Sequence, residues 1–212
     1  RVLFRSSHGK LGALLAQFPP SFKDSPASRD YLAALLEAFR NYPVAVELRH
    51  RSWSDQIGDT LALLGGHGAA WVQIDEPKFR FSIRQNYLPN VDTFYYMRLH
   101  GRNAADWWHP AHRDDRYNYL YSAQELQEFS ETLAAADTLV GKSYVYTNNH
   151  FSAKAVVNAV MLKAQLGQPI EGAYPADMVE RYPELSNLAP ISRQADRKST
   201  RLNCSHVKRS RM

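Results

Sequence analysis

Apolar residues along the chain recur with two different periods. Five short stretches either alternate between apolar and polar residues or run apolar, which is typical of β-strands. Between most of these stretches, apolar residues recur every three or four positions, which predicts amphipathic helices. Strands that alternate with helices form parallel sheets with right-handed crossovers, so we expect an α/β fold. The expected strands cover residues 11–18, 44–50, 70–75, 94–101 and 143–149.

Helix starts follow from capping residues within the same pattern. Ser28 and Ser152 each precede a helical run, and Ser122 forms a capping box with Glu125 at the start of another. Residues 76–92 show no clear period and are expected to form a loop. One crossover of the sheet is therefore expected to lack a strong helix.

The segment 103–121 combines aromatic and charged residues too irregularly for a core element. Long loops of this kind are often functional lids, so Trp107, Trp108, His109 and His112 are candidates to cover a site. A surface loop that is packed by its own aromatic residues is the alternative. The pattern alone does not decide between the two.

The distribution of polar residues favours a barrel over an open doubly wound sheet. Helices cover both faces of an open sheet, so its central strands are apolar on both sides. Here polar residues fall on one face of four strands, close to their C-terminal ends, as in a barrel interior that opens into a mouth. No glycine-rich phosphate-binding turn follows a strand, which disfavours a nucleotide-binding open sheet. The residues that we place on this shared face are Gln17, Glu47, Arg49, Gln73, Asp75, Arg98 and His100.

The C-terminal ends of the strands are also where barrel enzymes carry their catalytic groups. Glu47 and Asp75 are candidate bases, and His100 can titrate near neutral pH, so these three are the catalytic candidates. The alternative is structural, with Glu47–Arg49 and Asp75–Arg98 as ion pairs that fill the barrel and His100 as a buried histidine. Arginine side chains suit a carboxylate or phosphate ligand. The expected substrate-binding residues are Gln17, Arg49, His50, Arg98, Asn148 and Asn149.

Adjacent residues on a strand point in opposite directions, so only one of Asn148 and Asn149 is expected to face the mouth while the other holds a loop. A site for a divalent metal is an alternative, because Glu47, Asp75 and His100 offer ligands that suit zinc or manganese. Against a metal, neither the HxH nor the HExxH spacing occurs, and two arginines in the same mouth would repel a cation. The cofactor is left unassigned.

Charge and cysteine content narrow the classes of function. The net charge of +5 comes from residues 1–9 and 197–212, which contain eight basic and no acidic residues. Residues 10–196 contain 18 basic and 21 acidic residues. We expect residues 1–9 to be a non-native leader, 10–192 the domain, and 193–212 a non-native or disordered basic tail; a tail that binds nucleic acid is the alternative. The single cysteine, Cys204, lies in that tail, which fits a cytoplasmic protein. The chain has no apolar run of about 18 residues, the length that would predict a membrane span.

Several segments together resemble one family: QFPPSFK (17–23), VELRHRSW (46–53), YYMRLHG (95–101), RYNYLYSAQEL (116–126) and YVYTNNHFSAKAVVNA (144–159). They are similar, in order and spacing, to the uncharacterised YecE-like family, also called domain of unknown function 72, which has a TIM-barrel fold. Family members usually have Phe at the position of Thr147 and often Pro at that of Arg51, and neither change removes a charged candidate. The resemblance implies that three further strands precede the five seen here.

We therefore expect part of a TIM (β/α)8 barrel, namely strands four to eight. In the intact protein we expect an enzyme, a hydrolase, lyase or isomerase, that applies acid–base chemistry to a small polar or anionic substrate. One alternative is a metal-dependent phosphoester or nucleic-acid hydrolase, which the acidic middle of the chain disfavours. The other is a non-catalytic protein that binds a small ligand in the same mouth. The sequence predicts no oligomeric state.

Overall fold

The computed structural model describes residues 11–85, 87–108, 110–112, 114–188 and 190–192. The expected leader, the whole of the expected basic tail and His109 therefore lie outside the described residues. Five parallel strands form one sheet in sequence order, which confirms the parallel α/β prediction. These strands are β1 (Leu14–Gln17), β2 (Val44–Glu47), β3 (Ala70–Asp75), β4 (Tyr95–Leu99) and β5 (Ser143–Thr147).

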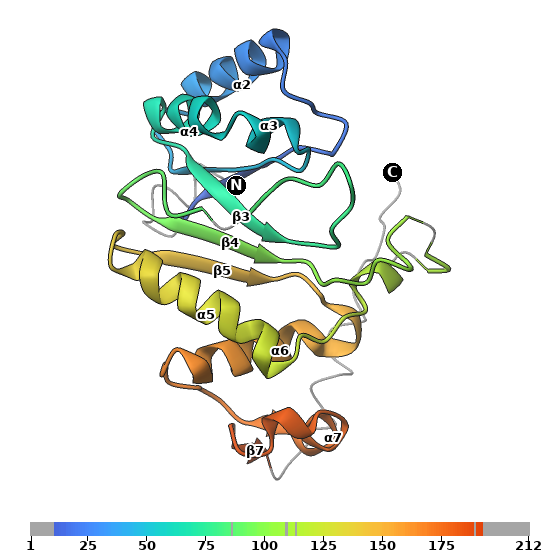
Figure 1. Cartoon of the computed structure of the whole chain (residues 1–212). Coiled ribbons are helices and arrows are strands. Elements are labelled where there is room, and N and C mark those ends of the chain that lie inside the picture. The colour runs from blue at the N-terminus through green and yellow to red at the C-terminus, as the bar shows by residue number, and fades with distance from the viewer. Residues whose placement is uncertain (1–10, 86, 109, 113, 189, 193–212) are drawn as a thin grey trace, which may run out of the picture.

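Helices connect most of the strands, as Figure 1 shows, with α2, α3 and α4 at one end of the sheet and α5 and α6 at the other. Among the described residues between β3 and β4 there is no helix, as the sequence predicts. The helices are α2 (Pro26–Ala38), α3 (Ser52–Asp55), α4 (Ile57–Gly66), α5 (Ala123–Asp137), α6 (Lys154–Gln165) and α7 (Ala176–Arg181). Short 3-10 turns are η1 (Asp115–Tyr117), η2 (Phe151–Ala153) and η3 (Pro183–Leu185), and β6 (Tyr174–Pro175) pairs in parallel with β7 (Ile191–Ser192).

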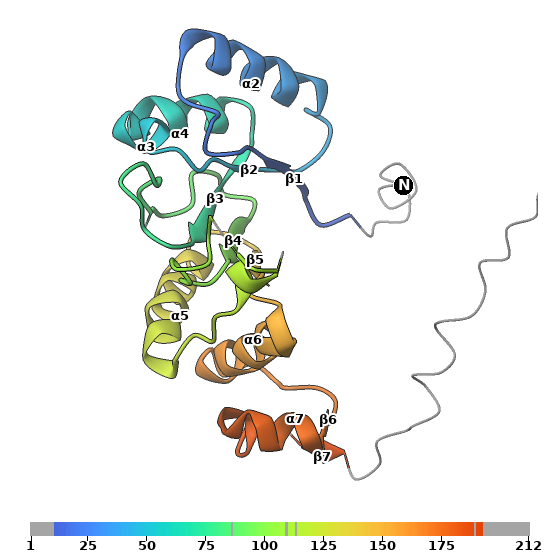
Figure 2. The same ribbon diagram turned by 90° about the vertical axis from the view of Figure 1, so that its right-hand side faces the viewer.

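The five-stranded sheet curls into a half barrel, which brings its first and last strands towards each other (Figure 2). A methyl group on Gly12, just before β1, would lie 3.0 Å from the ring of Tyr144 on β5. The Arg98 side chain on β4 also reaches Gln17 on β1, at 3.0 Å. This curl is consistent with a partial barrel. As an edge strand, β1 is shorter and more exposed than the buried strand that we expected over 11–18.

Register corrects the expected faces of β3. Residues that pair in parallel strands point to the same side of the sheet. Ile74 pairs with Arg98, whereas Asp75 pairs with Leu99 on the opposite face. The expectation that Gln73 and Asp75 share a face with Arg98 is therefore wrong. The inner face of β3 is apolar because it packs within the curled sheet, and its polar residues point outward.

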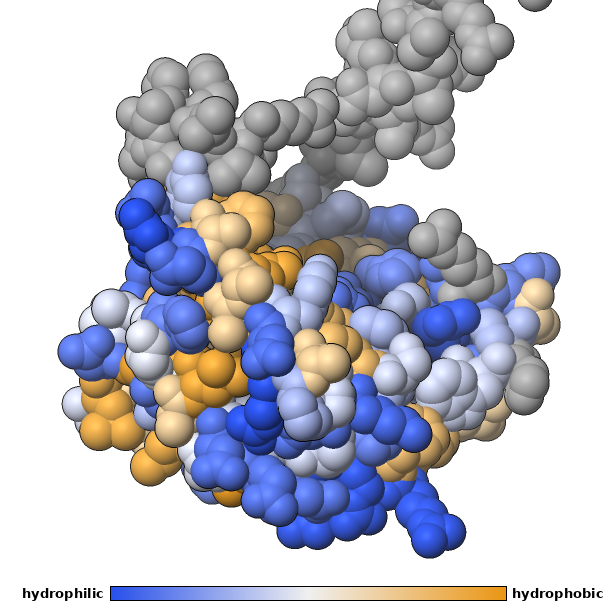
Figure 3. Space-filling model, turned by 90° about the horizontal axis from the view of Figure 1, so that it is seen from above, coloured by the Kyte–Doolittle hydropathy of each residue, from blue (hydrophilic) through white to orange (hydrophobic). Residues whose placement is uncertain are grey.

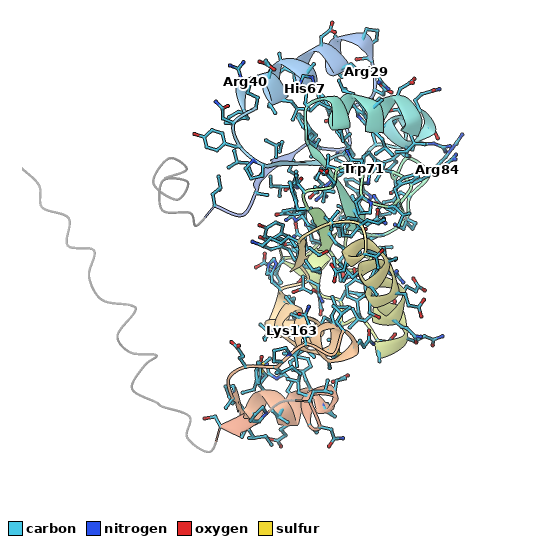
Figure 4. The ribbon with its side chains drawn as sticks, turned by 90° about the vertical axis from the view of Figure 1, so that its left-hand side faces the viewer. Arg29, Arg40, His67, Trp71, Arg84 and Lys163 are labelled. Carbon is cyan, nitrogen blue, oxygen red and sulfur yellow. The ribbon has the colours of Figure 1, made fainter. Side chains whose placement is uncertain are left out.

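The segment after β3 takes the place of the missing helix and bonds to residues beyond the part of β2 that pairs with β3. Ile83 donates a backbone hydrogen bond to Arg49 at 3.0 Å, in an antiparallel arrangement beyond the end of β2. The Asn90 side chain accepts from Trp71 and donates to Ala69, both at β3. These contacts satisfy polar backbone groups that a neighbouring strand would otherwise pair. Trp71 lies on the same outer face of β3 as Gln73 and Asp75, where it is buried and packs edge-on against Tyr87 (Figure 4).

Two clusters of buried apolar side chains hold the structure. One joins α2, α3 and α4 to the first three strands, around residues such as Leu36 and Trp53, and the other joins α5 and α6 to β4, around Leu99 and Leu133. From above the α2 end, hydrophobic and hydrophilic side chains are interspersed on the surface (Figure 3). In the described part of the chain, no helix combines the length and apolar composition that a membrane span requires.

Helix capping agrees with the sequence at α5 and differs at two other helices. Ser122 and Glu125 form the predicted capping box. The first helix is capped by Ser25 rather than Ser28, because Pro26 fits the first helical turn and the Ser28 amide donates to Ser25 Oγ at 3.1 Å. Ser152 caps nothing, since it has a positive φ of 51° before α6 begins.

Replacing Gly101 by alanine should destabilise the fold by about 1–3 kcal/mol. Gly101 follows β4 with a φ of +92°, and an added Cβ would lie 2.8 Å from Tyr119 Cβ. The matched control is Gly58→Ala on α4, where the added methyl group meets nothing within 4 Å. That control should gain about 0.5–1 kcal/mol from helix propensity. Urea denaturation of both variants gives the comparison, and equal stabilities would contradict it.

Candidate functional site

A buried carboxylate held by two arginines forms the centre of the candidate site. Glu47 ends β2 with 0% of its surface exposed. Its Oε1 lies 2.6 Å from Arg49 Nη2, and its Oε2 accepts a short hydrogen bond from Arg98. Gln17 Oε1 accepts from the same Arg98 at 3.0 Å. The structure thus brings together four predicted site residues from β1, β2 and β4.

His100 and Asn148 extend this cluster towards β5. His100 Nε2 lies 3.5 Å from Glu47 Oε1 and 3.3 Å from Arg49 Nη2. The other ring nitrogen, Nδ1, lies 3.0 Å from the side-chain amide of Asn148. If Asn148 donates to Nδ1, then Nε2 carries the proton and donates to Glu47, so the orientation of the amide selects the tautomer.

Glu76 is a member of the cluster that the sequence did not reveal. It directly follows β3, is 5% exposed, and places Oε2 3.3 Å from Arg49 Nη1. This ion-pair contact lacks hydrogen-bond geometry, and among the described residues Oε2 has no hydrogen-bond partner. Ile74 faces inward, and alternate residues share a face, so Glu76 is the next inward position. Had the inner face of β3 been assigned correctly, the sequence would have predicted Glu76 as a site residue.

The two carboxylates differ sharply in acidity. Burial alone would raise the pKa of Glu47, but the hydrogen bond with His100 and the charges of Arg49 and Arg98 lower it to about 2. Burial raises the pKa of Glu76 to about 7, and the single contact with Arg49 does not offset this effect. Burial also lowers the pKa of His100, which favours the neutral imidazole. Near neutral pH, Glu47 is therefore ionised, whereas Glu76 is divided between its protonated and ionised forms.

Asp75 belongs to a separate cluster on the outer face of the sheet. Its carboxylate accepts from Arg102 at 2.8 and 3.1 Å and from the Tyr121 hydroxyl at 2.7 Å. Arg102 continues to Glu125 at 3.2 Å, which ties the end of β3 to the start of α5. The expected Asp75–Arg98 ion pair does not form, because the two side chains point to opposite faces.

The remaining predicted residues occupy different surroundings. His50 Nδ1 lies 2.8 Å from Ser52 Oγ, and none of its contacts with described residues reaches Glu47 or His100. Asn149 is fully buried and donates to Tyr119 O and Asn158 Oδ1, both at 2.7 Å. Asn148 therefore faces the site while Asn149 holds a loop, the division of roles that the sequence predicts.

The aromatic residues proposed as a lid separate into two environments. Trp107 is buried and packs edge-on against Tyr117. Trp108 is half exposed and contacts Phe79 and Phe81 from the segment after β3. These contacts join the segments that follow β3 and β4, and they leave the lid hypothesis as a prediction.

The donors proposed for a metal do not converge. Glu47 is occupied by two arginines, and Asp75 lies on the other face of β3. Within the described ranges, no group of three or more His, Cys, Asp or Glu side chains is arranged to hold a metal ion.

Comparison with known proteins identifies relatives of this chain. A family model described as protein of unknown function DUF72 matches residues 2–181. The UPF0759 protein YunF of Bacillus subtilis (strain 168) is 28% identical over 180 residues, which are 80% of this chain and 62% of that protein.

Solved structures agree with the family match. A DUF72 family protein (TM1631) from Thermotoga maritima MSB8 has a TM-score of 0.73 at 35% identity, covering 79% of this chain and 62% of that one. A DUF72 family protein (EF0366) from Enterococcus faecalis V583 has a TM-score of 0.72 at 26% identity, covering 80% and 66%. The chain thus spans 62% of the length of YunF and of TM1631.

Replacing Glu47 by glutamine should destabilise the protein by about 3 kcal/mol or more, because it leaves two arginines without their buried counter-charge. The matched control is Glu37→Gln, which removes an exposed ion pair with Arg40 and should change stability by less than about 1 kcal/mol. Urea denaturation at neutral pH measures both. A Glu47→Gln variant as stable as the control would contradict the buried-charge interpretation.

Glu76 should make the folded state less stable as the pH rises from about 4.5 to about 7. In this window the folded state retains a proton that the unfolded state has already released, since folding raises the pKa from 4.5 to about 7. The slope from one such group is at most about 1.4 kcal/mol per pH unit. Glu76→Gln cannot lose this proton, so its stability relative to the wild type should increase across the window.

Unfolding free energies of both proteins at several pH values test this prediction. The lowered pKa of His100 acts in the opposite direction, with stability lost as the pH falls below about 6.5, but it affects both proteins alike. The difference between the two curves therefore isolates Glu76. A difference that stays constant from pH 4.5 to 7 would show that Glu76 does not hold its proton in the folded state.

Proposed function

Because this chain belongs to the DUF72 family, whose function is unknown, we propose a function from the site itself: acid–base catalysis on a small anionic substrate at the C-terminal ends of the strands. The proposal includes a hydrolase, a lyase or an isomerase. The main observation behind this proposal is that the Arg49 guanidinium contacts two carboxylates, Glu47 and Glu76. The pKa of Glu47 is lowered and that of Glu76 is raised.

Glu76 is the proton-transfer group in this proposal. A general acid or base works best when its pKa lies near the working pH, and the pKa of Glu76 is about 7. Two carboxylates whose surroundings separate their pKa values are a common arrangement in acid–base enzymes. With a pKa of about 2, Glu47 stays ionised and orients Arg49, Arg98 and His100. We accordingly assign Glu47 a positioning role rather than that of the base.

The charges of the site favour an anionic ligand. Arg49 and Arg98 contribute two positive charges, and Glu47 neutralises one of them. His100 is neutral, and Glu76 is uncharged whenever it holds its proton. The cluster therefore carries a net positive charge in its acid form, and guanidinium groups bind carboxylates and phosphates in a defined geometry. Gln17 and Asn148 supply amide groups on either side of this centre.

Asp75 is left out of the proposed catalytic set, because Arg102 and Tyr121 already hold its carboxylate on the outer face. We assign His50 and Asn149 supporting roles, because His50 contacts Ser52 and Asn149 bonds to Tyr119 and Asn158. The curled sheet supports our proposal that these strands correspond to strands four to eight of a TIM barrel. The absence of cysteine from residues 10–196 supports a cytoplasmic location.

Turnover of small anions tests the proposed function. The protein is incubated with a panel of carboxylates, hydroxy acids and phosphate monoesters, and product formation is followed by NMR. For any substrate that reacts, Glu76→Gln should lower kcat by about 10²–10⁴-fold with little change in KM, and the inflection of the rate near pH 7 should disappear. The matched control is Glu171→Gln, which changes an exposed glutamate outside the site and should react like the wild type.

The same experiment separates an enzyme from a binding protein. Ligands that bind without any product would favour the non-catalytic alternative. Full turnover by Glu76→Gln would remove Glu76 from the mechanism.

A further inference from the structure

A cavity of about 360 Å³ lies next to the Glu47–His100 cluster, between the segments that follow β4 and β5. Asn148 belongs to both, because it lines the cavity and contacts His100 Nδ1 at 3.0 Å. A molecule in the cavity would therefore be separated from His100 by the Asn148 side chain. The other lining residues are Asp114, Arg116, Tyr117 and His150.

Arg116 is the unusual member of this lining, because its charge is not neutralised. Among the described residues, no acidic side chain forms an ion pair with Arg116, and its buried Nε has no hydrogen-bond partner. The other arginines of this end of the molecule, Arg49, Arg98 and Arg102, all contact carboxylates. Because Arg116 lines the cavity without an acidic partner among the described residues, an anion in the cavity would supply the counter-charge of this guanidinium.

The rest of the cavity defines what such a ligand can be. The rings of Tyr117 and His150 lie 4.8 Å apart and form a wall beside Arg116. Asp114 lies 3.4 Å from His150 Nε2 and repels anions from that side. An oxyanion is therefore favoured at the Arg116 end, where planar N–H donors match the oxygens of a carboxylate or a phosphate.

We propose that this cavity binds the oxyanionic group, carboxylate or phosphate, of a small ligand through Arg116, while Asn148 connects the ligand to His100. The inference rests on the proposed function in one respect, namely that the bound molecule is the substrate of the neighbouring cluster. Binding of the anion in the cavity stands independently of any reaction.

Titration of the full chain with inorganic phosphate and, separately, with acetate tests the inference. The arginine Nε–Hε and Asn148 amide signals are followed by NMR, so that one titration distinguishes Arg116 from Arg49 and Arg98. We expect the signals of Arg116 and Asn148 to shift with saturation. Arg116→Gln should raise the Kd for the bound anion at least about tenfold, and Arg116→Lys should raise it less because the charge remains.

Two further variants complete the design. Arg181→Gln removes an exposed arginine on α7 and should leave the Kd unchanged. Asp114→Asn removes the repelling charge and should lower the Kd. A stronger response to phosphate than to acetate would assign a phosphorylated ligand, and the reverse would assign a carboxylate.

Three results would overturn the inference. The first is no shift of the Arg116 signal with either anion at about 10 mM. The second is an unchanged Kd in a folded Arg116→Gln or Arg116→Lys variant. The third is a shift confined to Arg49 and Arg98, which would place the anion in the central cluster and leave the proposed function standing. Conversely, Arg116-dependent binding together with full turnover by Glu76→Gln would confirm the cavity and reject the proposed mechanism.

Discussion

The buried carboxylate of Glu47 is the constraint on which the site depends. A carboxylate with no exposed surface is strongly unfavourable unless opposite charges and hydrogen bonds surround it. Arg49 from the end of β2 and Arg98 from β4 provide those charges, and His100 adds a further contact. Arg98 on β4 contacts both Glu47 on β2 and Gln17 on β1, and the curl of the sheet brings these strands within reach of one side chain. The electrostatics of one side chain and the curvature of the sheet are therefore linked.

The segment between β3 and β4 adds to this cluster a second carboxylate, Glu76, whose pKa is raised to about 7. This segment replaces a crossover helix and bonds to residues beyond the part of β2 that pairs with β3, where Ile83 pairs with Arg49. Glu76 begins this segment and is buried there with only one guanidinium contact. Glu47 and Glu76 therefore share Arg49 but differ in acidity, because two arginines hold one and burial dominates the other. An irregular connection thus provides a group that titrates near neutral pH.

The sequence predicts the regular parts of the molecule well and the exceptions poorly. The five strands, their parallel order and the Ser122 capping box follow from local patterns, and so does the meeting of Glu47, Arg49, Arg98 and His100. The sequence predicts the wrong face for Asp75, because it assumes that the polar residues of β3 face the mouth. The inner face of β3 is in fact apolar, and Asp75 lies on the outer face. The contact of Glu76 with Arg49, and the lack of an acidic partner for Arg116 within the described part of the chain, depend on tertiary packing of irregular segments, which periodicity does not describe.

The charged side chains Glu47, Arg49 and Arg98 gather at one end of the inner face of the sheet, which argues against a purely structural role. Further from the mouth, the same face is filled by Val72 and Tyr96, so the curled sheet can pack with apolar and aromatic side chains. Replacing buried ion pairs by apolar residues is often neutral or stabilising, so stability alone does not require charges at the mouth. Perturbed acidities that cluster at the C-terminal ends of parallel strands are typical of functional sites. These features support our proposal that the charged cluster binds an anion and that Glu76 transfers a proton.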